Sequence, residues 1–139
     1  MSHESLPQFL AKIDLFQGLS QDTLSDLIAR GTTLMIPAGQ HAVDQGANDA
    51  GLQVVLEGSA EVTVNGADRT PLGPGDYFGE ISLVDGLPRS ATVVAGPDGL
   101  TTFALSSLAF APVVKENPHV AQALLKALTA RIRSLEAKN

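Results

Sequence analysis

Two charged residues in the middle of the chain, Glu80 and Arg89, are of the types that bind a sugar phosphate. Residues 79–83 (Gly-Glu-Ile-Ser-Leu) can form one short helical turn, which residues 85–86 (Asp-Gly) would end, and the glycine lets a ligand come close. Free backbone N–H groups at the start of such a turn, with the positive end of the helix dipole, form an anion site. Arg89 follows ten positions after that glycine, and its planar fork can hold a phosphate in bidentate fashion.

Glu80 is expected to contact a neutral hydroxyl group. A carboxylate beside a phosphate would repel the ligand, whereas an ionised carboxylate can accept a hydrogen bond from a ribose hydroxyl. The two residues and the helical turn together predict a bound sugar phosphate. Each residue also has a structural interpretation: Arg89 could be a solvated loop residue, and Glu80 could be an acidic first-turn residue that complements the helix dipole.

Residues 78–93, FGEISLVDGLPRSATV, closely resemble the phosphate-binding cassette of the cyclic nucleotide-binding domain family. That family includes bacterial catabolite activators, regulatory subunits of cAMP-dependent protein kinase and cyclic-nucleotide-gated channels. The shared pattern is Phe-Gly-Glu, then small and apolar residues, then Gly-x-Pro-Arg followed by a small residue, Ala and Thr. The resemblance extends from about Phe9 to Leu135, with the turn at residues 37–39 and the lead-in at residues 72–76 also matching. It implies a β-roll between helices.

The resemblance also implies a role for each residue of the cassette. The ligand-binding residues it implies are Glu80 on the ribose 2′-hydroxyl, Arg89 on the cyclic phosphate, the backbone of Gly79, Ile81 and Ser82 near the ligand, and Ser90 beside phosphate and base. The expected ligand is cAMP. A hydroxyl at the position of Ser90 is associated with cGMP in some relatives, so cGMP is the alternative. Gln53 departs from the family, which often has an aromatic residue there.

The elements that would position this segment are strands and turns between helices. Apolar residues recur at helical spacing over residues 6–30, where Ser20 is a good N-cap for a second helix. From residue 32 to about 106 the chain has short apolar runs cut by Gly, Pro, Asn and Asp, which is typical of an antiparallel β-sandwich or barrel. The helical period returns over residues 107–138, with a last helix predicted from about Pro118 to Ala137.

Within the β region, the pattern predicts strands that each bury one face. Apolar and polar residues alternate over residues 52–57 and again over residues 59–65. Asn65-Gly66 and Asp98-Gly99 supply the left-handed backbone positions of hairpin turns, so each is expected to join two antiparallel strands. The predicted fold class is mainly β with flanking helices: a jelly-roll-like antiparallel β-roll in one domain, residues 1–139. N-terminal helices, a short cassette helix and a C-terminal lid helix complete it.

The last predicted helix carries an apolar stripe that could close over the base of a bound nucleotide. Leu128, Ile132 and Leu135 are expected to supply the cap, and Arg131 a polar contact. The resemblance to channel and kinase domains also implies such a lid. The other interpretations of the stripe are a permanent core contact and a dimer seam.

Composition restricts the chain to few classes of function. It has no cysteine, so disulfides, thiolate chemistry and a Cys-ligated zinc site are excluded. A net charge of -6 argues against broad contact with nucleic acid or an anionic membrane. The N-terminus lacks the basic start and apolar run of a signal peptide, and no stretch approaches the roughly 20 apolar residues of a membrane span. We therefore expect a cytoplasmic chain with no membrane insertion.

A cupin-type enzyme is one rival interpretation, because its small β-barrel gives a similar pattern of strands and turns. It requires clustered metal ligands, but His3, His41 and His119 are far apart in the sequence, and no nucleophile with a partner base is evident. We therefore expect no catalysis, no metal and no cofactor.

The other rival interpretations keep the family's fold. A DNA-reading regulator would need a helix-turn-helix domain, and the chain reaches Asn139 directly after the helix that would lead there, so no nucleic acid partner is expected. An interaction module that has lost its ligand would not need Glu80 and Arg89. The expected partners are a cyclic nucleotide and a regulated protein that the sequence does not identify.

Overall fold

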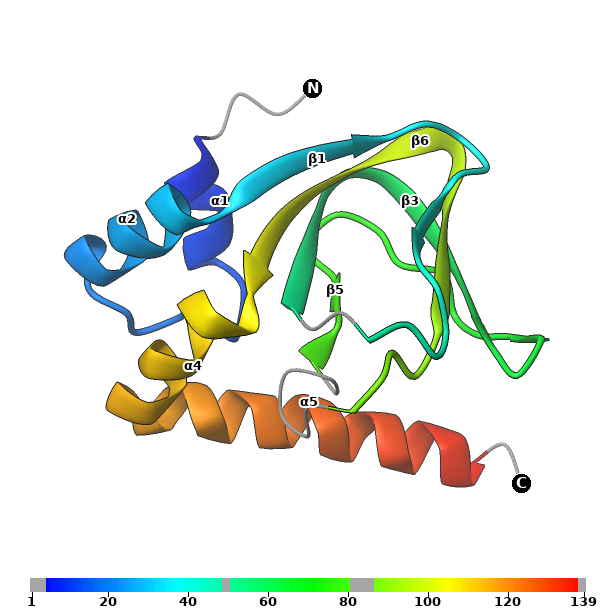
Figure 1. Ribbon diagram of the computed structural model, residues 1–139. Helices are drawn as coiled ribbons and strands as arrows, with labels where there is room; N and C mark the ends of the chain where they lie inside the picture. Colours follow the sequence, from blue (N-terminus) through cyan, green and yellow to red (C-terminus); the bar gives the residue numbers. More distant parts are fainter. Residues whose placement is uncertain (1–4, 49–50, 81–86, 138–139) are drawn as a thin grey trace.

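The computed structural model describes residues 5–48, 51–80 and 87–137, and it shows a curled sheet with three helices at one end and a long helix along it (Figure 1). The helices are α1 (Leu6–Ala11), α2 (Gln21–Arg30), α4 (Ser107–Glu116) and α5 (Pro118–Ala137). The strands are β1 (Thr32–Ile36), β2 (His41–Val43), β3 (Gly51–Val64), β4 (Ala67–Asp68), β5 (Tyr77–Phe78) and β6 (Thr92–Ser106). Within the described ranges, no helix combines the length and apolar character that crossing a membrane requires.

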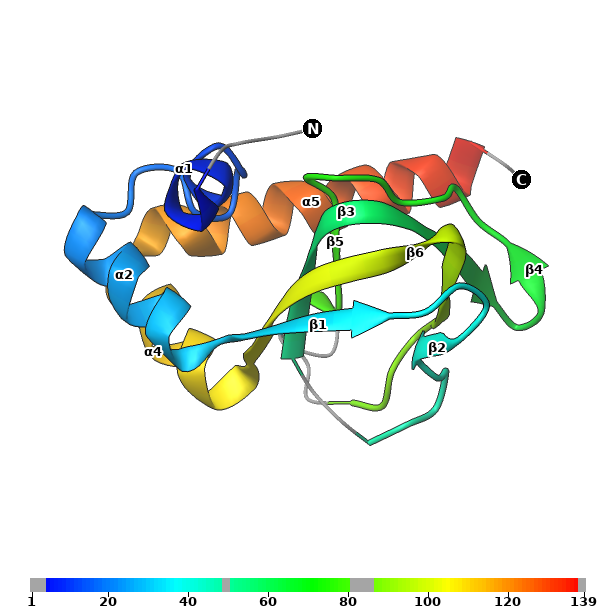
Figure 2. The ribbon, with the colours of Figure 1, turned by 90° about the horizontal axis from the view of Figure 1, so that it is seen from above.

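The sheet is antiparallel throughout and stays open. Its strands follow the order β1-β6-β3-β4, with β2 also paired to β6 and β5 also paired to β3. Seen from above, α1, α2 and α4 gather at one end of the curled sheet, and α5 runs along it (Figure 2). The predicted fold class, mainly β with flanking helices, is confirmed. The cassette helix lies at residues outside the described ranges.

The ends of the elements agree with the local signals in the sequence. Ser20 caps α2, because its side chain accepts a hydrogen bond from the backbone N–H of Thr23 at 3.1 Å. The last helix begins at Pro118 and ends at Ala137, as predicted. Asn65-Gly66 forms the expected hairpin between β3 and β4, with φ of 53° and 79° at the two residues.

The second predicted hairpin is wrong. Asp98-Gly99 lies inside β6 and joins no pair of strands. Gly58 of β3 pairs with Leu100, whereas Ala60 pairs with Ala95, so residues 96–99 form a bulge in β6. A Cβ at Gly58, where φ is +82°, would overlap the carbonyl of Gly99. A left-handed backbone conformation occurs in bulges as well as in turns. Here β3 and β6 come close together at Gly58 and Gly99, and the left-handed residues form a bulge.

Two apolar clusters hold the molecule together. The helical core joins the helices to one face of the sheet and includes Leu10, Phe16, Leu27, Leu52, Val54, Phe103, Leu105, Phe110, Val120 and Leu124. The roll core fills the inside of the curled sheet with Val43, Val55, Ala60, Val62, Phe78, Val93, Ala95 and Leu100.

The start of β3 is buried on both faces, which corrects the prediction that each strand buries one face. Val54 packs in the helical core and its neighbour Val55 packs in the roll core. Gln53 is also buried, and its Oε1 accepts a hydrogen bond from Thr102 Oγ1 at 2.8 Å. The helices cover one face of this segment and the curled sheet covers the other. The alternation of polar and apolar residues therefore wrongly predicted that one face would be exposed.

Candidate functional site

Gly79 sits at the end of β5 in a conformation that only glycine adopts without strain. Its φ is +96°, and a Cβ at this position would overlap the carbonyl oxygen of Gly51 and lie 2.5 Å from Arg89 Nη1. Pairing of Phe78 with Gln53 fixes β5 against β3 just before this point. The glycine therefore allows the arginine side chain to lie directly against the backbone.

Arg89 is buried and held in place through both its backbone and its side chain. Its N–H donates to Ala47 O at 2.9 Å, and its carbonyl accepts from Gly46 N at 2.9 Å. Its Nη1 donates to Gly51 O at 2.8 Å, and the residue is only 6% exposed. A buried guanidinium with a fixed orientation is suited to bidentate recognition of an anion, because little side-chain entropy remains to be lost.

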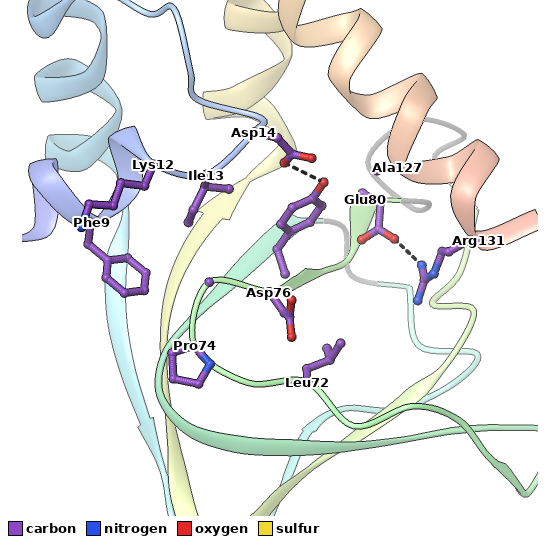
Figure 3. Close-up of a pocket in the computed structure, with 12 residues that line it drawn as sticks. Phe9, Lys12, Ile13, Asp14, Leu72, Pro74, Asp76, Glu80, Ala127 and Arg131 are labelled. Atoms are coloured by element: carbon purple, nitrogen blue, oxygen red, sulfur yellow. Dashed lines mark hydrogen bonds and ion pairs between the residues drawn. The ribbon is translucent and has the colours of Figure 1, made fainter. Parts of the chain in front are cut away.

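Glu80 is buried beside Arg89 and pairs with the last helix. Its Oε1 accepts a hydrogen bond from Arg131 Nη1 of α5 (Figure 3). Its Oε2 is buried and has no hydrogen-bond partner among the described residues. Burial raises the pKa of the carboxyl group, while Arg131, the residue's own backbone N–H and Arg89 act in the opposite direction. An unsatisfied buried acceptor is costly, so Oε2 is suited to receive a donor from a ligand.

Two adjoining cavities lie between the sheet and α5. The inner cavity is small, about 20 Å³, and Gly79, Arg89 and Ser90 are among its lining residues. The outer cavity holds about 520 Å³ and lies against α5, with Leu128 and Ile132 on its helix side. The two share the lining residues Val62, Ser90, Ala91 and Arg131. The two cavities therefore adjoin, and Arg89 lines the inner one while the outer one has mainly apolar walls.

A third cavity, the side cavity, lies between α1, residues 72–77 and α5 (Figure 3). It also holds about 520 Å³, and it is the cavity that Glu80 lines. Tyr77 lines it and donates a hydrogen bond from its hydroxyl group to Asp14 Oδ1 at 3.0 Å. Burial and the negative charge of Asp14 raise the pKa of Tyr77. Arg131 borders all three cavities, so it connects the carboxylate of Glu80 to the site that contains Arg89.

The structure brings most of the predicted ligand-binding residues into this region. Gly79, Arg89, Ser90, Leu128, Arg131 and Ile132 line the inner or outer cavity. Glu80 reaches them through its ion pair with Arg131 but lines the side cavity. Ile81 and Ser82 lie outside the described residues, as does the side chain of Leu135.

Sequence reasoning missed several residues of the site. Gly51, whose carbonyl oxygen anchors Arg89, is 38 positions away along the chain, and no local pattern marks it. Arg69 and Thr70 line the outer cavity. For these two a signal existed: the hairpin at Asn65-Gly66 folds Arg69 back onto Val62, whose carbonyl accepts from Arg69 N at 2.8 Å. Continuing the pairing with β3 beyond this hairpin, with side chains alternating between the two faces, would have placed Arg69 and Thr70 near the site.

Comparison with known proteins agrees with this geometry. The family model of the cyclic nucleotide-binding domain matches residues 33–117. A cyclic nucleotide-gated potassium channel of Mesorhizobium japonicum is 32% identical over 124 residues, which cover 89% of this chain and 34% of the channel. One from Rhizobium etli is 30% identical over 125 residues, with the same 89% and 34% coverage. The chain thus spans about a third of the length of these channels.

Solved structures give the same result. The catabolite activator protein of Thermus thermophilus has a TM-score of 0.75 and 28% identity, covering 90% of this chain and 61% of that one. The N-terminal domain of a transcriptional regulator from Streptomyces coelicolor has a TM-score of 0.70 and 27% identity, covering 94% of each chain. The sensor domain of the regulator DNR from Pseudomonas aeruginosa shares the fold, with a TM-score of 0.78 at 22% identity, covering 95% of this chain and 91% of that one. Because the family model matches more than half of it, the chain belongs to the cyclic nucleotide-binding domain family.

Proposed function

We propose that this chain is a cAMP receptor that regulates a partner protein or an attached domain and catalyses no reaction. Family membership supports a cyclic nucleotide as the ligand. The observation that carries the proposal is Arg89: a buried guanidinium, anchored on Gly51 O, at a small cavity that adjoins a larger one against α5. A buried cation at the closed end and apolar walls at the open end match a ligand with a phosphate at one end and a purine at the other.

In this proposal the cyclic phosphate binds at the inner cavity. Arg89 donates to the phosphate oxygens, Ser90 lies beside phosphate and base, and backbone groups of Gly79, Ile81 and Ser82 are proposed to lie near the ligand. Glu80 accepts a hydrogen bond from the ribose 2′-hydroxyl through its unpartnered Oε2. Glu80 is needed in its ionised form for this bond, because only then are both of its oxygens acceptors.

Ligand binding is proposed to move α5. The inner cavity is small, about 20 Å³, and α5 contributes to its wall, so a phosphate that binds there lies against this helix. Arg131 is the lining residue that comes from α5. Leu128, Ile132 and Leu135 of the same helix then close over the base. A ligand can shift the helix only by binding the closed form better, so these contacts must contribute to affinity.

Titration calorimetry with cAMP tests the proposal. We expect saturable one-to-one binding that 5′-AMP does not reproduce, because the open monophosphate carries another charge and lacks the cyclic ester. Wild type should also discriminate against 2′-deoxy-cAMP, by about 1.5–3 kcal/mol for a hydrogen bond to a charged group, and Glu80→Ala should not. Absence of heat and of a thermal shift with both cAMP and cGMP would favour the alternative of an interaction module without a ligand. Equal discrimination by wild type and Glu80→Ala would remove Glu80 from the ribose.

The second candidate ligand is cGMP. The observation that favours it is the place of Ser90, whose side chain is exposed and borders both the inner and the outer cavity. A hydroxyl group there can accept from, or donate to, the edge of a base as well as a phosphate. The same calorimetric experiment with cGMP measures the preference directly.

A further inference from the structure

Strand β1 is a free edge of the sheet that the nucleotide site does not use. It ends the strand order, and among the described strands it pairs with β6, from Thr32 opposite Ala104 to Ile36 opposite Leu100. Figures 1 and 2 both show it on the side of the sheet away from α5. Every second residue of an edge strand directs its N–H and C=O away from its partner strand, so these groups are open to pairing with another strand.

This edge lacks the features by which edge strands usually avoid such pairing. Residues 32–36, Thr-Thr-Leu-Met-Ile, include no charged residue and no proline, and their pairing with β6 has no bulge. Met35 is 82% exposed and Leu34 is 37% exposed. Because successive side chains point to opposite faces, both faces of the edge carry exposed apolar groups. The strand is therefore a template for a further strand.

A groove lies at the C-terminal end of this edge. It holds about 410 Å³ between residues 35–38 and residues 97–101. Asp98 lines the groove and is exposed, and within the described part of the chain it has no hydrogen bond or ion pair. Most of the other lining residues, such as Met35, Pro37 and Leu100, are apolar. The carboxylate is thus open to a cation from a chain that lies along the edge.

A cation stands at the opposite end of β1. Arg30 is the last residue of α2, two positions before Thr32. Its Nε lies 3.2 Å from Asp26 Oδ2, and the two side chains are 56% and 61% exposed. An ion pair as exposed as this contributes little to stability, so Arg30 can exchange Asp26 for another carboxylate. The edge therefore has a positive group before its start and a negative group beyond its end.

Antiparallel pairing of two copies of β1 brings these opposite charges together. A register centred on Leu34 pairs all five residues of both strands, so that Thr32 of one copy lies opposite Ile36 of the other. The two-fold axis through this point places Arg30 of each copy near the groove that holds Asp98 of the other. We propose that the chain forms a two-fold dimer in which the two β1 strands join the sheets of both copies.

The dimer is expected to be weak. A net charge of -6 on each copy repels the other at long range, but the Debye length at physiological ionic strength is about 8 Å, so contacts along the strands decide. The contact of one five-residue strand is small beside the roughly 1,200–2,000 Å² of stable interfaces. We therefore expect a Kd between about 10 µM and 1 mM. The cavities against α5 stay uncovered, so dimerisation does not require a nucleotide.

Sedimentation equilibrium of the full chain, over about 10 µM to 1 mM, tests the proposal. Wild type should move toward twice its monomer mass as the concentration rises. Met35→Lys places a charge in the middle of the edge and should weaken association by at least about tenfold. Leu108→Lys on α4 and Leu125→Lys on α5 introduce the same charge at residues that are 86% and 63% exposed. Neither control should change association.

Reversal of the flanking charges tests the register. Arg30→Glu and Asp98→Arg should each weaken association, by about 2- to 30-fold, the range of two exposed ion pairs. The double variant Arg30→Glu, Asp98→Arg should recover most of the loss, because the exchanged charges again attract across the two-fold axis. Urea unfolding of each variant checks that the domain is intact, which the exposure of the substituted side chains favours.

Three outcomes would overturn the proposal. Wild type that stays monomeric at about 1 mM would leave the edge to a strand of a different protein. A dimer that Leu125→Lys weakens and Met35→Lys does not would have its interface on α5. A double charge variant that associates as weakly as the single variants would exclude the antiparallel arrangement centred on Leu34. None of these outcomes bears on nucleotide binding, which is measured separately.

Discussion

Arg89 is tied to the fold before any ligand arrives. Its Nη1 satisfies the buried carbonyl of Gly51, and its backbone is bonded to Gly46 and Ala47. Through its side chain Arg89 thus contacts β3, and through its backbone it contacts the turn at residues 46–47. Fixed geometry of this kind favours binding, since the guanidinium loses little freedom when it takes up a phosphate.

Substitution of Arg89 should therefore affect both affinity and stability. Arg89→Ala should weaken cAMP binding by about 2–5 kcal/mol, because a buried phosphate would lose its charged partner. It should also lower the free energy of unfolding, by about 1–3 kcal/mol, because Gly51 O would be left unsatisfied. Calorimetry and denaturant unfolding measure the two effects. An affinity within threefold of wild type would remove Arg89 from the site, and Arg89→Lys, which keeps the charge, serves as the comparison.

The raised pKa of Glu80 should make the free energy of unfolding depend on pH. Burial raises the pKa of this carboxyl group above its ordinary value of 4.5, in spite of Arg131 and Arg89. The folded state then binds the proton more tightly than the unfolded state does. The stability that the protonated group supplies is complete below pH 4.5 and is lost as the pH rises through the raised pKa.

Comparison with Glu80→Gln, which stays neutral, isolates this effect. The free energy of unfolding of wild type should decrease relative to that of Glu80→Gln as the pH is raised from 4.5 to 8, measured with urea and without nucleotide. The contributions of other titrating groups cancel in the difference. If the difference in free energy of unfolding between the two proteins stays constant, or changes in favour of wild type as the pH rises, the attraction by Arg131 outweighs the effect of burial.

At the scale of elements, α5 has a fixed half and a half exposed to the site. Val120 and Leu124 are buried in the helical core, whereas Leu128 lines the outer cavity and Ile132 is 55% exposed. A helix anchored at one end can move at the other without unfolding the domain. This division supports the proposal that the C-terminal half of α5 is the lid.

Truncation after Leu125 should separate the two halves. The truncated chain keeps Val120 and Leu124, so it should still unfold cooperatively, but it should bind cAMP at least about tenfold more weakly, a loss of about 1.4 kcal/mol. Because truncation also unpairs Glu80, the double substitution of Leu128 and Ile132 by Ala is the second test and should shift affinity in the same direction. Leu125→Ala, on an exposed part of α5, is the matched control. Binding as tight as that of the full chain would show that α5 is no lid.

At the scale of the whole molecule, the site lies at the junction of two cores. The helical core holds α1, α2, α4 and the first half of α5, and residues of the roll core line the inner cavity. Glu80 and Arg131 bridge the sheet and the last helix. Ligand binding at this junction can change how the helices pack on the sheet, which is how a receptor would transmit its signal to an attached partner.

The intact receptor should leave its ligand unchanged. Hydrolysis of the phosphodiester requires a metal ion or an activated water, whereas the roles proposed for Arg89 and Glu80 are to bind the phosphate and the ribose. Incubation with cAMP, followed by chromatography, should return cAMP alone. AMP that increases with protein concentration and disappears in Arg89→Ala would contradict this expectation.

Much of the architecture was predictable from local signals. The β region begins at Thr32 and ends at Ser106, and the last helix spans Pro118–Ala137, as the change in apolar period and the proline indicated. The site was predictable to the extent that the cassette is continuous in sequence, since Gly79, Glu80, Arg89 and Ser90 are all brought to the region of the cavities. Gly51 and the ion pair with Arg131 could not be predicted, because they join residues 38 and 51 positions apart.

The sequence by itself determined where elements start and end and which residues could bind a nucleotide. Those properties depend on backbone preferences and side-chain chemistry, which neighbours in the chain decide. Only the tertiary structure decided that Asp98-Gly99 is a bulge, that both faces of β3 are buried at Val54 and Val55, and that Arg131 holds Glu80. Each depends on which distant segment covers a residue. A two-residue period of apolar side chains indicates that the two faces of a strand differ, but it does not indicate which segments pack against each face.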